Sequence, residues 1–284
     1  MNDETMACVV LNYNDWSTTL KMVNVIKNYK SINNVVIVDN DSPNDSFLKL
    51  REEFKNNSKV HVIKSKKNGG YGYGNNIGIN YAYEKLKDKY VILSNPDVMF
   101  KENMICNLVK IMIEKNAAMV SGVQYVNGKP IPYKSRAWRI PTAFQYTFST
   151  TRIAPYINYS YTQDAYAKKI MQVDCVPGAM MLIDAKKFIS VGGYDERMFL
   201  FCEETTIGYK FKQKGYKTYL LNNERYDHLV SVSINKNIPQ RNKQTSLIMK
   251  NRLFFIKHYL QPSKLEYFID KQVLLRKIRL LEKK

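Results

Sequence analysis

The sequence is poor in cysteine. Its four cysteines, Cys8, Cys106, Cys175 and Cys202, lie far apart and form no CxxC pair. Zinc sites use closely spaced pairs, and small disulfide-stapled proteins contain cysteine at higher density, so both classes are disfavoured. We therefore expect reduced cysteines that act as small apolar residues, and hence a cytoplasmic protein.

Long apolar runs are also missing from the 284 residues. A helix that spans a bilayer needs about 20 predominantly apolar residues, and no stretch approaches that length, so no transmembrane helix is expected. The first five residues are acidic and lack the basic-then-apolar order of a secretory signal, so we expect no such signal.

Acidic residues are outnumbered by basic ones. The chain has 44 Lys and Arg against 25 Asp and Glu, which gives a formal net charge of +19. Because 45% of the residues are hydrophobic, there is enough apolar material for a buried core, and a wholly disordered basic tail is excluded. The positive charge predicts an anionic partner, and nucleic acid, acidic lipid and nucleoside diphosphates all remain open.

Short apolar runs alternate with helix-like patterns along the first hundred residues. The runs at 6–11, 35–38, 60–63 and 90–93 are typical of strands in a sheet that is covered on both faces. Apolar residues at helical spacing follow the first two runs, and a further helix is expected near 75–87. This order predicts an α/β fold with a parallel sheet between layers of helices.

The second half of the chain is less regular. Residues 127–172 are rich in Tyr, Pro and Arg, and we expect them to run over the surface as an excursion. Strands are expected at 180–183 and 218–221, with a helix near 204–214 between them.

Polar side chains follow the predicted strands at the points where these strands end. The clusters are Asn12-Tyr13-Asn14, Asp39-Asn40, Lys67-Asn68 and Asn95-Pro96-Asp97. Parallel α/β sheets bind ligands at the carboxyl ends of their strands. One such cluster would be an ordinary loop, but four after successive strands predict the rim of a single ligand site.

Two of these clusters carry carboxylates that suit a nucleotide. Asp97 could bind a hard divalent cation that also holds a diphosphate, although a Pro-containing turn with a capping Asp explains the same residues. Asp39 could accept hydrogen bonds from a nucleobase or a ribose hydroxyl, and a simple turn is an equally good explanation.

A glycine-rich segment, residues 68–78, leads into the helix after the third strand. Its glycines lack the GxGxxG spacing, so a nicotinamide or flavin site is disfavoured. The glycines could let backbone N–H groups approach a ligand closely, and a flexible loop before a helix is the alternative.

An acidic pair and a histidine complete the candidate residues. Glu203 and Glu204 lie at a predicted helix N-terminus, where the helix dipole is a sufficient reason for acids, and the alternative is a general base. His228 comes just past the last predicted strand. It is a metal-ligand candidate if Asp97 lies nearby in the fold, and otherwise a structural residue.

Taken in order, these segments resemble a family 2 inverting glycosyltransferase of the GT-A fold, a Rossmann-like, mostly parallel sheet flanked by helices. The resemblance covers about residues 6–235 and is carried by the segments 9–14, 36–40, 68–78, 93–98, 177–183 and 192–204. Within the family, the Asn-Tyr-Asn opening, the Asn-Pro-Asp motif and the basic stretch at 136–141 resemble a bacterial rhamnosyltransferase-like group. That group builds capsule, O-antigen and cell-wall polysaccharides.

The resemblance implies a role for each candidate residue. Mg²⁺ or Mn²⁺ would be held by Asp97 and His228, and Glu204 would be the general base that deprotonates an acceptor hydroxyl. The donor, a dTDP- or UDP-linked sugar, would be bound by Asn12, Asp39, Asn40, Asn68, Gly70, Asn75, Asn95 and Asp97. The acceptor or the diphosphate would be contacted by Arg136, Arg139 and Glu203.

Two departures from the family pattern stand out. Glu204 occupies a position where the family usually has Asp, which keeps the carboxylate and lengthens its reach. Thr206 stands where many members have another acid, so any contact made by that acid is in doubt here.

The C-terminal segment is expected to form helices with a different task. We divide the chain into a catalytic domain, 1–235, and basic amphipathic helices, 236–284. From Lys250 onward, ten Lys and Arg stand against three Asp and Glu, interleaved with apolar residues. Such helices can lie on an anionic membrane surface, and packing on the catalytic domain explains them equally well. We expect peripheral attachment to the inner face of the plasma membrane, where a lipid-linked saccharide acceptor would be found.

Two other classes of protein share some of these sequence features. A sugar-nucleotide pyrophosphorylase-type nucleotidyltransferase would need a basic, glycine-rich loop after the first strand, where residues 12–15 read Asn-Tyr-Asn-Asp. A nucleic-acid-binding protein would show a recognition motif or clustered stacking aromatics. Neither feature is present in the sequence, and no nucleic acid partner is expected.

Overall fold

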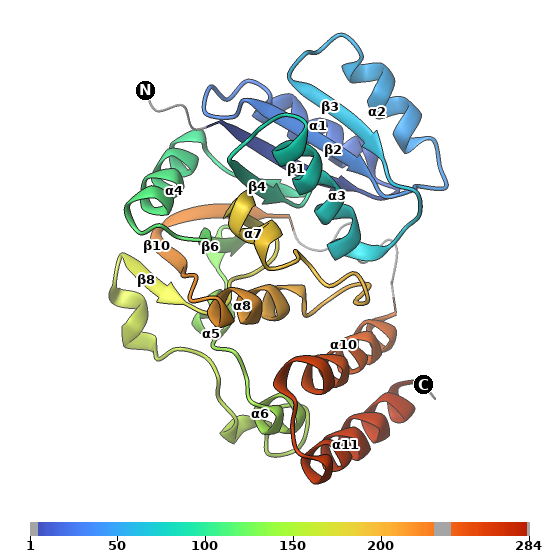
Figure 1. Cartoon of the computed structure of the whole chain (residues 1–284), viewed down its shortest axis with the longest axis vertical. Coiled ribbons are helices and arrows are strands. Elements are labelled where there is room, and N and C mark those ends of the chain that lie inside the picture. Colours follow the sequence, from blue (N-terminus) through green and yellow to red (C-terminus); the bar gives the residue numbers. More distant parts are fainter. Residues whose placement is uncertain (1–4, 230–239, 283–284) are drawn as a thin grey trace.

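The computed structural model describes residues 5–229 and 240–282 (Figure 1). Within these residues the core is a ten-stranded sheet with the strand order β3-β2-β1-β4-β9-β6-β10-β5, to which β7 adds at β6 and β8 at β10. The strands are β1 (Met6–Asn12), β2 (Asn34–Asp39), β3 (Val60–Lys64), β4 (Tyr90–Ser94), β5 (Val98–Met99), β6 (Met119–Val126), β7 (Lys129–Pro130), β8 (Ile170–Val173), β9 (Met180–Asp184) and β10 (Thr218–His228).

The first half of the sheet is parallel. β1 pairs in parallel with β2 and β4, and β2 pairs in parallel with β3. Alternate residues of a strand point to opposite faces, so β1 contributes to two separate cores. Met6, Cys8 and Val10 pack under the helices α1 (Trp16–Ile26), α2 (Ser46–Phe54) and α4 (Glu102–Glu114). Ala7 and Val9 pack under α3 (Gly70–Glu84), α7 (Ala185–Ser190) and α8 (Glu203–Gln213). The α/β architecture predicted from the sequence is confirmed.

The glycine-rich segment belongs to α3, which begins at Gly70 and not near residue 75. The glycines allow this helix to pack closely on β1. A Cβ atom at Gly74 would lie 2.3 Å from Leu11 Cδ1, and one at Gly78 would lie 2.4 Å from Val9 Cγ1. Helix propensity alone disfavours so many glycines, and tertiary packing overrides it here.

The second half of the sheet is mixed. β9 runs antiparallel to both β4 and β6, while β10 is parallel to β6 and antiparallel to β5 and β8. The sequence predicts a strand only over 218–221, but β10 continues to His228 through a register shift between Leu221 and Arg225. Residues 222–225 are polar and interrupt the apolar run, so the pattern does not reveal this continuation. The extension brings the end of β10 against β5.

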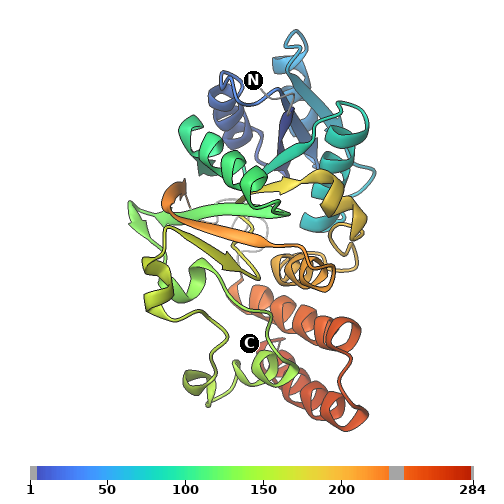
Figure 2. The same cartoon turned by 60° about the vertical axis from the view of Figure 1, so that its left-hand side comes forward.

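The segment between β7 and β8 leaves the sheet and reaches the C-terminal helices (Figure 2). It contains α5 (Tyr133–Arg136), α6 (Ala143–Phe148) and two short 3₁₀ helices, Ala154–Tyr156 and Gln163–Ala167. A capping box at Thr142 and Gln145 fixes the start of α6.

The predicted C-terminal helical extension is also confirmed. It consists of α10 (Arg241–Phe255), a π-helical turn (Ile256–Leu260) and α11 (Lys264–Glu282), which lie together at the lower end of the molecule in Figure 1. These helices share a buried cluster with α6 and Met198. The proposed boundary at 235/236 lies outside the described residues. Among those residues, no helix is both long and apolar enough to cross a bilayer.

Candidate active site

The ends of β1 and β2 are joined by a buried hydrogen-bond network. Asp39 Oδ2 accepts hydrogen bonds from Asn12 Nδ2 at 2.7 Å and from Ser42 Oγ at 2.8 Å, and Asp39 Oδ1 accepts from the Ser42 N–H at 2.9 Å. Asn12 and Asp39 have no exposed surface. The Asp39 carboxylate therefore holds the two strand ends together, and its contact with a nucleobase stays a prediction.

Asn40 connects the end of β2 to the start of α3. Its Nδ2 donates to Asn68 Oδ1 at 3.0 Å and to the Gly70 carbonyl at 3.1 Å. Asn75 lies in the first turns of α3, where its Nδ2 donates to the Tyr71 carbonyl at 3.0 Å. Six of the predicted donor-binding residues thus lie around one edge of the sheet: Asn12, Asp39, Asn40, Asn68, Gly70 and Asn75.

Gly70 allows two loops to meet. Its φ of +89° is in the left-handed region, and a Cβ atom there would lie 1.9 Å from the Phe199 carbonyl oxygen. The Tyr71 N–H donates to that same oxygen at 2.9 Å. The start of α3 is therefore packed directly on the segment that leads to Glu203 and Glu204.

Asp97 and His228 are neighbours in space because β5 pairs with the end of β10. His228 Nε2 lies 3.2 Å from Asp97 Oδ1, and the two side chains are only 12% and 4% exposed. Asn95, also a predicted donor-binding residue, lies in the turn between β4 and β5. Its N–H donates to the Ala179 carbonyl at 2.9 Å. This bond fixes the turn that delivers Asp97.

The Asp97–His228 pair fits a divalent cation. A carboxylate oxygen and an imidazole nitrogen that face each other are both ligands that Mn²⁺ accepts, and Mg²⁺ commonly takes one or two protein carboxylates together with substrate phosphates. Over residues 5–229 and 240–282 there is no cluster of three or more His, Cys, Asp or Glu suited to a metal. Phosphate oxygens and water would have to supply the remaining ligands.

Glu203 and Glu204 begin α8, as the sequence predicts, but their surroundings differ. Glu203 is 3% exposed and its Oε1 has no hydrogen-bond partner. Glu204 Oε1 accepts a hydrogen bond from the Gly178 N–H at 3.1 Å, and its side chain lines a cavity. Burial raises the pKa of both carboxyls, and the adjacent charge of Glu204 raises the pKa of Glu203 further. The pKa of Glu203 is therefore raised more strongly than that of Glu204, so a proton shared by the pair favours Glu203.

The backbone just before this pair is strained. Phe201 and Cys202 have φ values of 75° and 71°, in the left-handed region, which costs roughly 1–2 kcal/mol for each non-glycine residue. Asn251 of α10, itself buried, donates from Nδ2 to the Leu200 carbonyl at 2.7 Å and to the Phe201 carbonyl at 3.0 Å. The C-terminal helices therefore hold the turn that positions Glu204.

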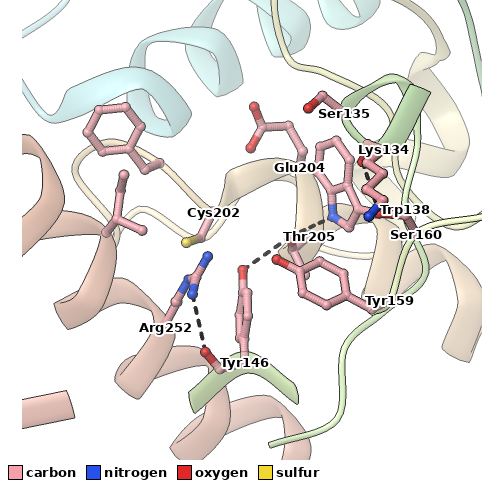
Figure 3. Close-up of a pocket in the computed structure, with 12 residues that line it drawn as sticks. Lys134, Ser135, Trp138, Tyr146, Tyr159, Ser160, Cys202, Glu204, Thr205 and Arg252 are labelled. Carbon is pink, nitrogen blue, oxygen red and sulfur yellow. Dashed lines mark hydrogen bonds between the residues drawn. The ribbon is translucent and has the colours of Figure 1, made fainter. Parts of the chain in front are cut away.

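Glu204 faces a cavity of about 330 Å³ that is lined by residues of the segment 134–160, the start of α8 and α10 (Figure 3). The hydroxyl of Thr205 fixes two of its aromatic walls, because Thr205 Oγ1 accepts hydrogen bonds from Trp138 Nε1 at 3.1 Å and from Tyr146 OH at 3.3 Å. The lining residues are Lys134, Ser135, Trp138, Tyr146, Tyr159, Ser160, Phe201, Cys202, Glu204, Thr205, Ile248 and Arg252.

The two arginines predicted to contact the acceptor or the diphosphate lie beside this cavity and do not line it. Arg136 Nε donates to the Ile131 carbonyl at 3.0 Å, and Arg139 Nη1 donates to the Ser160 carbonyl at 2.9 Å. The guanidinium of Arg139 lies 4.5 Å from the centre of the Tyr161 ring. Their predicted contacts with substrate stay predictions.

Several lining residues were missed by the sequence analysis. Trp138 lies between the two arginines and is one of only two tryptophans, and Thr205 directly follows Glu204, so both had a signal in the sequence. Arg252 had none, and neither had Asn251, which holds the turn before Glu204 and does not line the cavity, because their segment was interpreted only as a basic amphipathic helix.

The structure thus presents polar strand ends, an Asp–His pair and an acidic pair on a mixed α/β sheet, the features on which the resemblance to a GT-A glycosyltransferase rests. Residues 7–189 match the model of the family described as "Glycosyl transferase family 2". The chain belongs to this family. Membership favours glycosyl transfer over the nucleotidyltransferase and nucleic-acid-binding alternatives.

Similar sequences include two named transferases. The chain is 24% identical over 212 residues to "Low-salt glycan biosynthesis hexosyltransferase Agl10" of Haloferax volcanii, and this match covers 75% of the chain and 63% of that protein. It is 25% identical over 159 residues to "Rhamnosyltransferase WbbL" of Escherichia coli (strain K12), with 53% of the chain and 57% of that protein covered. The matches thus span about three fifths of the length of these relatives.

Similar solved structures confirm the GT-A fold. "GalNAc-T7 with UDP, GalNAc and Mn2+" superposes with a TM-score of 0.65 at 18% identity, over 98% of this chain and 57% of that one. A mannosyltransferase from Pyrobaculum calidifontis, PcManGT, "in complex with GDP-Man and Mn2+", superposes with a TM-score of 0.61 at 12% identity, over 99% and 74% of the two chains. At these identities the similarity concerns the fold alone.

Proposed function

We propose that this protein transfers a sugar from a nucleoside diphosphate-sugar to a hydroxyl group of a saccharide acceptor, with inversion at the anomeric carbon. The observation that carries the proposal is the setting of Glu204. A carboxylate with a raised pKa, fixed by the Gly178 N–H, faces a cavity with aromatic and hydroxyl walls. This arrangement suits the deprotonation of a bound hydroxyl.

Glu204 is the general base of the proposed reaction. It removes the proton of the acceptor hydroxyl as that oxygen forms a bond to the anomeric carbon and the bond from this carbon to the diphosphate breaks. The transition state resembles an oxocarbenium ion, as in glycoside hydrolysis. Burial and the charge of Glu204 raise the pKa of Glu203, which disfavours a second negative charge beside the base.

The donor is assigned to the edge of the sheet where β1 and β2 end and α3 begins. Asp97 and His228 would hold Mg²⁺ or Mn²⁺ there. When bound, the cation supplies positive charge that offsets the negative charge of the departing diphosphate. Uridine and thymidine diphosphates are the nucleotides we expect, with rhamnose or another hexose as the sugar. The similarity to a rhamnosyltransferase and a hexosyltransferase supports this choice.

A donor screen tests the proposal. The melting temperature of the protein is measured with Mn²⁺ and dTDP-rhamnose, UDP-glucose, UDP-galactose or GDP-mannose, and slow hydrolysis of each donor is followed in parallel. We expect one nucleotide class to stabilise the protein only when Mn²⁺ is present, because only the bound state gains binding free energy. Failure of every donor to stabilise the protein or to be hydrolysed would count against the proposal.

The acceptor is proposed to be a lipid-linked precursor of a cell-surface polysaccharide, met at the inner face of the plasma membrane. The outward face of α11 supports this location. Leu265, Phe268 and Ile269 are 71%, 58% and 43% exposed there, and the exposed Arg276 and Arg279 follow on the same face. Apolar side chains flanked by basic ones favour the surface of an anionic membrane.

Sedimentation with anionic liposomes tests the location. We expect the protein to sediment with vesicles that contain phosphatidylglycerol and to stay in the supernatant with purely zwitterionic ones. Leu265→Ser combined with Phe268→Ser should weaken sedimentation without lowering the melting temperature, because both side chains are exposed. Equal sedimentation of the double variant, or none of the original protein, would contradict a membrane role for α11.

A further inference from the structure

The cavity beside Glu204 has a positively charged wall that the proposed chemistry does not use. Arg252 of α10 lines this cavity, on a different wall from Glu204 (Figure 3). Asp97 and His228 are not among the lining residues, so the charge of Arg252 does not face the pair assigned to the cation and the diphosphate.

The guanidinium of Arg252 is held in place by uncharged groups. Its Nη1 donates to the Tyr146 carbonyl at 3.2 Å and to Ser149 Oγ at 3.0 Å, and its centre lies 4.8 Å from the middle of the Tyr146 ring. Its Nε is buried and has no hydrogen-bond partner. Among the residues that the structure describes, no carboxylate forms an ion pair with it.

An oriented arginine without an acidic partner suits an oxyanion. The guanidinium presents donors in a planar fork that matches carboxylate and phosphate groups, and hydrogen bonds between charged partners are the strong ones. A partly desolvated guanidinium that merely joined two helices would be expected to have an acidic partner. The strongest interaction that Arg252 can form, a hydrogen bond with an anionic group, is therefore available to a ligand.

The remaining walls suit a sugar ring. Trp138, Tyr146 and Tyr159 offer flat apolar faces, and Ser135 and Ser160 offer hydroxyl groups near them. Because Thr205 already accepts the Trp138 and Tyr146 hydrogen bonds, both rings are oriented before any ligand arrives. A site of this kind combines apolar contact with a few placed polar groups.

We propose that this cavity binds the acceptor saccharide, and that Arg252 binds an oxyanion, carboxylate or phosphate, which that saccharide carries. The inference rests on the proposed glycosyl transfer and names its acceptor class. The hydroxyl that reacts lies at Glu204, and the oxyanion lies at the α10 wall, away from the carboxylate of the base. The C-terminal helices thus select the acceptor as well as holding the turn before Glu204.

Fluorescence of Trp138 reports binding directly. The chain has two tryptophans, so Trp16→Phe, on α1 outside the cavity, leaves Trp138 as the single emitter. This protein is titrated with methyl glucoside, methyl glucuronide and glucose 6-phosphate, first alone and then with Mn²⁺ and the nucleotide that stabilises it most. We expect at least one anionic probe to bind about tenfold or more tightly than the neutral glucoside, as hydrogen bonds to charged groups allow. The glucuronide and the phosphate separate the two sources of the oxyanion.

Two variants test the role of Arg252 against a matched control. Arg252→Gln should bring the anionic probes to the affinity of the neutral one, and Arg252→Lys should keep part of the preference. Lys250→Gln removes one charge from the same helix at an exposed position paired with Glu282, and should leave the preference intact. If Arg252→Gln does not fold, the comparison of Arg252→Lys with the original protein still tests the role of Arg252.

The outcomes are distinguishable from failure of the proposed function. Equal affinity for neutral and anionic probes, a preference that survives in Arg252→Gln, or no binding of any probe would each overturn the inference. Stabilisation by nucleotide and Mn²⁺ is measured on the same samples, and its persistence would leave the proposed transferase function standing. Selective binding of the anionic probes without any nucleotide effect would instead count against the transferase function alone.

Discussion

His228 Nε2 lies 3.2 Å from Asp97 Oδ1, although 131 residues separate the two in the sequence. Gln124 Nε2 lies 3.0 Å from the other ring nitrogen of His228, Nδ1. A metal ion at Nε2 requires the proton to be on Nδ1, which must then donate to an acceptor. The side-chain amide of Gln124 provides one, Oε1, if it turns over. Gln124 therefore both positions the imidazole and can follow its change of tautomer.

Loss of either ligand should weaken metal-dependent nucleotide binding. We expect Asp97→Asn and His228→Ala to raise the Kd of the nucleotide in the presence of Mn²⁺ by about tenfold or more, and Gln124→Ala by a smaller factor, as for residues that orient metal ligands. Isothermal titration calorimetry measures the Kd of the nucleotide both with and without Mn²⁺. The metal-independent Kd should not change, and an unaltered Kd with Mn²⁺ in the ligand variants would refute the assignment.

Asn251 should influence catalysis without touching the substrate. Asn251→Ala removes the donor to two partly buried carbonyls that precede Cys202, which should cost roughly 1–3 kcal/mol of stability. Because the turn that carries Glu204 is loosened, kcat should fall by more than the donor KM changes. Asn28→Ala, which removes an exposed amide just after α1 that donates to the Asn24 carbonyl, is the control for a general effect. A variant with lowered stability and unchanged kcat would show that the turn needs no such support.

Stability should depend on pH through Glu203. Burial raises the pKa of Glu203 above its usual 4.5, so above pH 4.5 the unfolded chain releases a proton that the folded chain keeps, and stability falls as the pH rises. Glu203→Gln replaces the carboxyl with an uncharged amide, which imitates the protonated acid, so the variant should not lose this stability as the pH rises. Its stabilising effect should be near zero at pH 4 and should grow by about 1.4 kcal/mol per pH unit until the pKa of the folded protein is reached. Denaturant unfolding at several pH values measures it, and a difference independent of pH would contradict the assignment.

Much of the fold could be predicted because the patterns that indicate its strands and helices are formed by residues close together in the sequence. Strands such as 6–11 and 35–38 are buried on both faces and appear as uninterrupted apolar runs. The polar residues that end these strands are also local signals, and they lie around one edge of the sheet as predicted, while their contact with a donor stays a prediction. By contrast, β10 was predicted too short, because polar side chains are tolerated where its pairing with β6 shifts register.

The cavity beside Glu204 was much harder to predict, because it depends on contacts between distant segments. Arg252 and Trp138 lie on one cavity only after α10 has packed against α6, and no periodicity records that packing. Glu203 and Glu204 were found as a pair, but the sequence does not show that burial raises the pKa of both carboxyls, nor that the charge of Glu204 raises the pKa of Glu203 further. Similarly, the glycines at 68–78 were predicted to let the backbone approach a ligand, whereas at Gly70 the structure shows that the Phe199 carbonyl leaves no room for a side chain.

The most direct test of the central claim is the rate of sugar transfer by Glu204→Gln. We expect transfer to fall by about 10²–10⁴-fold, the usual contribution of a general base, while the nucleotide and Mn²⁺ still raise the melting temperature as in the original protein. Glu52→Gln, an exposed change of the same kind on α2, should keep the full rate. A Glu204→Gln protein that retains more than about a tenth of the original rate would contradict the role of Glu204 as the general base.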